Sequence, residues 1–172
     1  MVASSSERST LLKRQIRGWI VFVGFAIIIS GVTAFPMETE LKWLQQYRDQ
    51  MPADVDQWLK QVFEGIRETN QKYPFLAYGY DWLAFAHIVI AISLFGPFRD
   101  PVKNVWIIEW NMICCVLVFP LALIAGPSRH IPFFHQVVDC SFGLIGLIPL
   151  IVIRKKINEM ERLGLPDSPD MG

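Results

Sequence analysis

Three side chains that could do chemistry lie within long apolar stretches of this chain, namely His87, His135 and Asp139. Ionisable groups are costly inside a lipid bilayer, so those found within membrane spans mark candidate functional sites. His135 and Asp139 are four residues apart and therefore share one helix face. Two histidines and a carboxylate are a common ligand set for metals, and histidine also titrates near neutral pH, as a proton relay requires.

Several interpretations of these residues are open. A metal ion could bind His87, His135 and Asp139, or a haem could take His87 as its single axial ligand. The same groups, with Asp81 and Arg129 nearby, could instead form a site for a polar substrate or a proton. In the structural alternative, His87 hydrogen-bonds a neighbouring helix. His135 and Asp139 then pair with each other or with Arg129.

Four apolar stretches must position these residues, and each has roughly the ~20 residues that cross a ~30 Å hydrocarbon layer. They cover residues 18–35, 82–98, 105–125 and 133–153. Hydrophobic residues make up 52% of the 172 residues, and at this length one domain is expected. The sequence therefore predicts an all-α membrane protein whose domain, residues 18–163, is a four-helix transmembrane bundle.

The segment between the first two stretches, residues 36–79, is polar but carries apolar residues at helical spacing. This pattern predicts two amphipathic helices, a short one up to Met51 and a clearer one from Val55 to Tyr73. Such helices lie flat on a membrane surface or cover a bundle as a lid. They could simply cover the end of the bundle, or they could form a gate or a docking surface.

The distribution of positive charge predicts the orientation. Lys and Arg dominate residues 1–17, 99–103 and 154–162, whereas the segment 36–79 mixes bases with acids. By the positive-inside rule the N-terminal segment and the tail, residues 164–172, are cytoplasmic, and the segment 36–79 is extracytoplasmic. The tail is expected to be disordered. The first stretch is expected to be an uncleaved helix rather than a signal peptide, and the expected location is a bacterial inner membrane.

Two further polar residues lie on the inner side of the third stretch. Glu109 is about one helical turn inside the membrane, where Lys103 or Arg99 is expected to reach it. Asn111 is expected to make one hydrogen bond to another helix. Both are interpreted as packing residues.

The net charge and the absence of catalytic motifs reduce the number of function classes that fit the sequence. Zero net charge without a long basic block excludes nucleic acid as a partner, because phosphate binding needs clustered Lys and Arg. Without a catalytic signature, the leading prediction is an accessory membrane subunit that contacts lipid and binds a protein partner through residues 38–72. The alternative is a membrane-embedded enzyme, or a metal- or haem-binding protein, that uses the outer His and Asp residues.

The order of one span, one outward segment and three further spans resembles that of claudin-like proteins, but their paired extracellular cysteines are absent. Quinone-linked disulfide-forming proteins are also small bundles, and this chain has no Cys-x-x-Cys. The stretches Phe35–Glu40 and Gly96–Pro101 resemble those of small uncharacterised bacterial inner-membrane proteins. That resemblance implies no activity.

Overall fold

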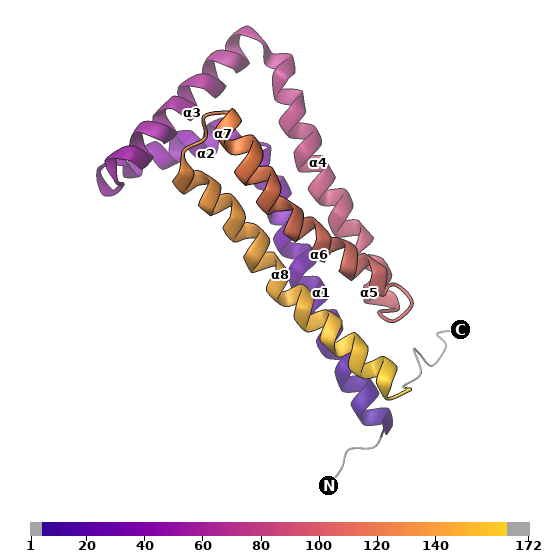
Figure 1. Cartoon of the computed structure of the whole chain (residues 1–172). Coiled ribbons are helices and arrows are strands. Elements are labelled where there is room, and N and C mark those ends of the chain that lie inside the picture. The colour runs from indigo at the N-terminus through magenta and orange to yellow at the C-terminus, as the bar shows by residue number, and fades with distance from the viewer. Residues whose placement is uncertain (1–4, 165–172) are drawn as a thin grey trace. The chain divides into compact units, whose positions relative to one another are not determined.

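The computed structural model describes residues 5–164, which form helices joined by short turns (Figure 1). No strand occurs within this range, so the predicted all-α class is confirmed. The elements in chain order are α1 (Ser5–Ala34), α2 (Met37–Leu44), η1 (Gln45–Gln50), α3 (Ala53–Lys72), η2 (Pro74–Ala77), α4 (Tyr78–Ser93), α5 (Phe95–Arg99), α6 (Val105–Pro120), the π-helix η3 (Leu121–Ala125), α7 (Gly126–Ser128) and α8 (Phe133–Arg162).

Within residues 5–164, four helical segments are long and apolar enough to cross a membrane, which confirms the predicted number of spans. Large apolar side chains on them, such as Phe25, Ile92 and Ile124, are exposed rather than buried. In water such surface would be costly, whereas lipid tails solvate it. The four segments are Glu7–Ala34, Pro74–Arg99, Val105–Ser128 and Phe133–Arg162.

The chain divides into two compact units, and the boundaries fall within α1 and α4. One unit combines the chain up to Phe25 with the chain from Ala91 onward, and the other is Ala26–Ile90. The first unit therefore holds most of the membrane-spanning helices. The second holds the segment between the first two spans together with the adjoining parts of α1 and α4.

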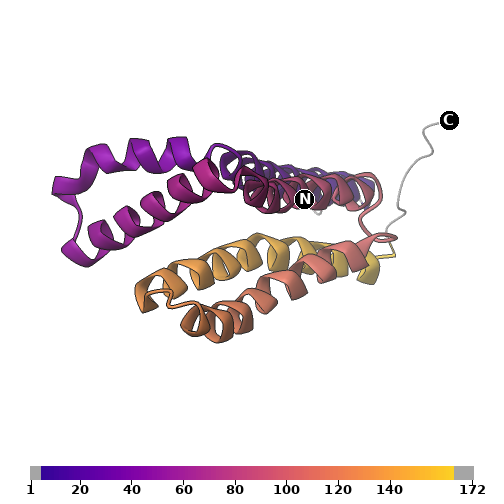
Figure 2. The ribbon, with the colours of Figure 1, turned by 90° about the horizontal axis from the view of Figure 1, so that it is seen from above.

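In the first unit α6 and α8 run side by side in opposite directions (Figures 1 and 2). A glycine allows the close approach, because a Cβ atom added at Gly143 of α8 would lie 2.6 Å from the backbone oxygen of Cys115 in α6. Small residues at helix contacts are the usual means of packing helices in lipid. Ile108 of α6 and Leu150 of α8 are buried in this unit.

Helix α1 begins earlier than the apolar stretch 18–35 predicts. It starts at Ser5 and includes most of the basic segment 1–17. Leu12, Ile16 and Ile20 recur every four residues on one face and are buried, so this part of the helix has an apolar stripe between its charges. Packing of that stripe explains why the helix extends beyond the apolar run.

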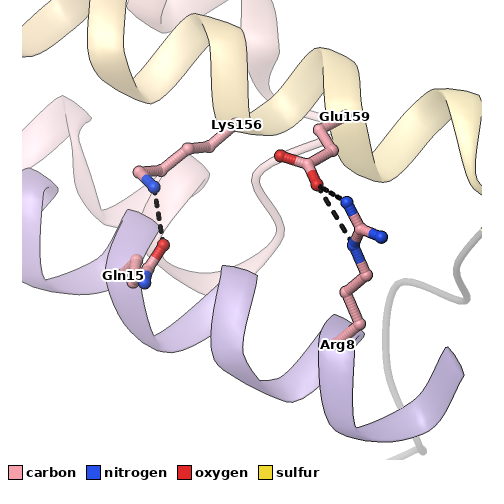
Figure 3. A network of polar contacts seen from close by, with 4 residues as sticks. All are labelled: Arg8, Gln15, Lys156 and Glu159. Carbon is pink, nitrogen blue, oxygen red and sulfur yellow. Dashed lines mark hydrogen bonds and ion pairs between the residues drawn. The ribbon is translucent and has the colours of Figure 1, made fainter. Parts of the chain in front are cut away.

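Helix α8 likewise continues past the predicted end at residue 153 and reaches Arg162. Ile153, Ile157 and Met160 are completely buried, although charged residues surround them in the sequence. Polar contacts join this end of α8 to α1, as Figure 3 shows. Arg8 donates to Glu159 Oε1 at 2.6 Å, and Lys156 Nζ donates to Gln15 Oε1 at 2.6 Å.

In the second unit α2, η1 and α3 form a helical hairpin, residues 37–72, in which α2 packs along α3 (Figure 2). Polar contacts close it at both ends. Near its turn, Arg48 makes a bidentate contact with Asp56 at 2.5 and 2.8 Å, and at the other end Asn70 Nδ2 donates to Glu38 Oε2 at 2.9 Å. No residue of α2, η1 or α3 is buried.

Candidate functional sites

His87 lies on α4 at the point where α1 crosses it. A Cβ atom added at Gly31 of α1 would lie 2.8 Å from both the backbone oxygen of Ala84 and the Cβ of His87. The ring nitrogen Nδ1 lies 2.8 Å from the Leu83 carbonyl oxygen. Because a carbonyl only accepts, Nδ1 carries a proton, and in the neutral form of the ring Nε2 then has the lone pair that a metal would need. The hydrogen bond is therefore within α4, not to a neighbouring helix as the structural alternative expected.

His135 and Asp139 lie on one face of α8, one turn apart. His135 Nε2 is 3.8 Å from Asp139 Oδ1, and both side chains are 41% exposed. A contact of this length is an ion pair only when the histidine is protonated. The geometry is the mutual pairing that the structural alternative expected.

The other two residues of the predicted polar site lie at helix ends. Arg129 is exposed in the turn between α7 and α8, and Asp81 is half-buried in the first turn of α4. Asp81 and His87 belong to one unit, whereas Arg129, His135 and Asp139 belong to the other. Within neither unit do three His, Cys, Asp or Glu side chains of residues 5–164 form a metal-binding group. The metal and haem sites stay predictions.

A buried amide that the sequence analysis missed lies beside His135. Gln136 is buried at the start of α8, and its Nε2 donates to the Ile131 carbonyl oxygen at 2.8 Å. Its side chain lies directly over Gly126, where an added Cβ atom would be 2.7 Å from Gln136 Cδ. This packing fixes the turn that carries Arg129. The sequence signal for this residue is an uncharged amide in an apolar run, one position after His135.

Glu109 pairs with a different cation from the one expected. Arg154 Nε of α8 donates to Glu109 Oε1 at 2.7 Å, so the expectation of Lys103 or Arg99 was wrong. The antiparallel packing brings the end of α8 to the start of α6, whereas sequence distance alone favoured the nearby cations. Arg154 also contacts Asn158, and its Nη1 lies 3.6 Å from a carboxylate oxygen of Glu161.

Asn111 is buried in α6, but the interhelical hydrogen bond expected for it is not the one it forms. Its Nδ2 donates to the Ile107 carbonyl oxygen of its own helix at 2.9 Å. Amide side chains often take an acceptor one turn back in the same helix, which satisfies a donor without any partner helix. Asn111 therefore serves packing rather than a site.

A groove of about 500 Å³ opens on one face of the α6–α8 pair. Its floor is apolar and its one polar end is the ion pair between Glu109 and Arg154. Pockets that hold small molecules combine an apolar lining with a few polar groups in this way. The lining residues are Glu109, Met112, Ile113, Val116, Leu117, Leu147 and Arg154.

The ion pair between Arg48 and Asp56, the clasp of the hairpin, predicts that the hairpin responds to pH. The hydrogen bond from Arg48 lowers the pKa of Asp56 below its ordinary value of 3.8. Because the pKa of Asp56 is lower in the closed hairpin than in the open one, the ionised carboxylate stabilises the closed hairpin at pH values above the ordinary pKa. This stabilisation is lost as the pH falls through the lowered pKa of the closed hairpin. The effect should be small because the pair is exposed.

Spin labels at the exposed positions Gln46 and Gln57 would report the opening of the hairpin at low pH. The distance distribution measured by pulsed electron paramagnetic resonance should broaden below pH 3.8. In Asp56→Asn it should already be slightly broader at neutral pH and should change less than in the wild-type protein over that range. An unchanged distribution in the wild-type protein down to pH 2 would show that the clasp does not hold the hairpin closed.

The described residues thus offer two kinds of site, a histidine at a helix crossing and a groove with a charged end. Neither carries the full residue set of a known catalytic centre, such as a nucleophile oriented by a base. Comparison with known proteins adds no relative, since no protein-family model, no curated protein and no solved structure matches the chain.

Proposed function

We propose that this chain is an accessory subunit of a membrane complex, without catalytic activity of its own, that binds a protein partner through the hairpin 37–72. The observation that carries the proposal is that the hairpin is closed at both ends by polar contacts and yet buries none of its residues. A segment with fixed shape and uncovered surface is suited to docking.

The exposure of α3 supports an amphipathic hairpin. Polar positions such as Lys60, Glu64 and Arg67 are exposed. The apolar positions that alternate with them at helical spacing are only half-buried, so contact with α2 leaves part of that face uncovered. A partner surface would complete the burial. The half-buried apolar residues of α3 are Val55, Trp58, Leu59, Val62, Phe63 and Ile66.

The charge of the hairpin favours a protein over a lipid surface as its partner. Helices that lie on membranes are typically rich in Lys and Arg on their polar face. Here acidic residues outnumber basic ones by seven to five. The acids are Glu38, Glu40, Asp49, Asp54, Asp56, Glu64 and Glu68, and the bases are Lys42, Arg48, Lys60, Arg67 and Lys72.

The distribution of charge also supports the placement. The ends of α1 and α8 that meet through Arg8 and Glu159 are rich in Lys and Arg, so both termini are assigned to the cytoplasm. The hairpin, which lies between the first and second spans, is then extracytoplasmic. In a bacterial inner membrane it would face a partner in the periplasm or the outer leaflet.

Trp43 is the expected anchor of the interface. It is 56% exposed on α2 and packs edge-on against Tyr47, with ring centroids 5.0 Å apart. Exposed aromatic pairs of this kind are typical interface hot spots, and truncating one commonly costs ~2 kcal/mol of binding, roughly 30-fold in affinity. We expect Trp43→Ala to weaken partner binding by about this factor.

A photoreactive amino acid at Tyr47 would capture the partner in native membranes. The crosslinked adduct should form in the wild-type background and fall several-fold with Trp43→Ala. Trp106→Ala is the matched control, because Trp106 is equally exposed but lies on α6, outside the hairpin. No adduct in the wild-type background, or equal losses for both variants, would refute the proposal.

A second candidate function is cofactor binding at His87, favoured by the Nδ1 contact with Leu83 that leaves the Nε2 lone pair for a ligand. Haem or a metal would then be held near the crossing of α1 and α4. A visible absorption spectrum and metal analysis of the purified protein, beside His87→Ala, distinguish this function from partner binding alone.

A further inference from the structure

The groove on α6 and α8 has a polarity that changes along its length. Ile113, Val116 and Leu117 of α6 and Leu147 of α8 line its apolar part. Arg154, at its polar end, is the first charged residue after the apolar run of α8, so in a membrane its long side chain would reach the lipid headgroups. It follows Leu147 by seven positions, roughly 10 Å along the helix axis.

We propose that this groove binds one phospholipid whose headgroup carries both a phosphate and a primary amine, as phosphoethanolamine does. One acyl chain lies along the apolar part between α6 and α8. The phosphate contacts Arg154, and the ammonium contacts Glu109. The site uses no residue of the hairpin 37–72 and is therefore independent of the proposed partner.

The lining favours an acyl chain over a transmembrane helix as the occupant. Helices pack in lipid through small residues that let their backbones approach. This pair already uses its small residues on another contact, since Gly143 lies against the Cys115 backbone and Gly146 near the Cys115 side chain. The groove instead presents methionine and branched aliphatic side chains. Flexible methylene chains fit such an uneven surface.

The charges at the polar end select the headgroup. The guanidinium of Arg154 is a planar fork that suits phosphate oxygens. Within the lining it pairs with Glu109 at 2.7 Å, whereas Glu161, 3.6 Å from it, lies outside the lining, so the groove holds one cation and one anion. A headgroup that carries only negative charge would complement Arg154 but be repelled by Glu109. A headgroup with an ammonium as well as a phosphate complements the charges of both Glu109 and Arg154. The side chain of Glu109 is 47% exposed and therefore accessible to the ammonium.

Native mass spectrometry of the full chain in mild detergent tests the lipid preference. The protein is titrated with phosphatidylethanolamine, phosphatidylcholine and phosphatidylglycerol of the same acyl chains. We expect the first to bind roughly tenfold more tightly, because its ammonium both donates hydrogen bonds to Glu109 and carries the opposite charge. The quaternary ammonium of phosphatidylcholine has no N–H donor, and the hydroxyl groups of phosphatidylglycerol are uncharged. Equal occupancy by the three lipids would overturn the proposal and leave ordinary contact with bulk lipid.

Variants separate the groove from the rest of the lipid-facing surface. Leu147→Trp should fill the groove and abolish the preference, whereas Leu144→Trp, an exposed position on the same helix outside the lining, should keep it. Glu109→Gln should bring binding of the ethanolamine lipid down to that of the choline lipid. Thermal stability measured in lipid-free detergent shows that each variant is folded. Retained preference in Leu147→Trp would also overturn the assignment.

Discussion

Gly143→Ala is expected to force α8 away from α6. The added methyl group would lie 2.6 Å from the Cys115 backbone oxygen and 3.3 Å from the Val118 Cβ, and neither atom can rotate aside. Overpacking of this kind typically costs ~1–3 kcal/mol. That cost opposes the gain of up to ~1 kcal/mol that alanine brings over glycine in a helix. We expect a net loss of stability together with weaker contact between the two helices.

Gly18→Ala is the matched control for this substitution. Gly18 also lies in a helix, α1, but no atom lies within 4 Å of the position its Cβ would take. The control keeps the gain in helix propensity and lacks the clash, so its melting temperature in detergent should equal or exceed that of the wild type. A Gly143→Ala protein as stable as Gly18→Ala would mean that α6 and α8 are not in close contact.

Gly31→Ala is expected to have a comparable effect in the other unit. Its methyl group would meet two atoms at 2.8 Å, the Ala84 backbone oxygen and the His87 Cβ. Either α1 or α4 must shift, and a shift of α4 would move the histidine as well. Gly79→Ala, on α4 with nothing within 4 Å of the new methyl group, is the control.

This substitution also distinguishes the two roles of His87. If the histidine binds haem or a metal, Gly31→Ala should reduce the bound cofactor while Gly79→Ala retains it, as measured by visible absorption and metal analysis. If His87 only packs at the crossing, the wild-type protein should be colourless and metal-free, and thermal unfolding alone should report the substitution. Unchanged stability in Gly31→Ala would contradict the crossing itself.

The four spans could be predicted because each is a continuous run of apolar residues in the sequence. The helix ends could not be predicted in this way, because α1 and α8 extend beyond their apolar runs. Ile16 and Ile157 lie in charged stretches, and only helical spacing, rather than average hydropathy, identifies them as buried. Ion pairs between residues far apart in the sequence could not be predicted from local patterns. Glu109 and Arg154 are 45 positions apart, and their contact depends on the antiparallel packing of α6 and α8.

The candidate site shows the same division. One-turn spacing correctly predicted the contact between His135 and Asp139. The acceptor chosen by Asn111 lies in its own helix, which is a matter of rotamer and burial that spacing does not determine. Whether His87 meets His135 depends on the packing of separate helices, which apolar patterns constrain weakly, so that prediction stands as it was.

The contact between Arg8 and Glu159 joins residues 151 positions apart, nearly the two ends of the chain. During synthesis the N-terminal part of α1 therefore emerges well before its partner residue on α8. The contact between Arg8 and Glu159 can form only after α8 has been synthesised as far as Glu159. A chain that stops before Glu159 would leave Arg8 without this contact, so the polar contacts of the first helix depend on residues that are made much later.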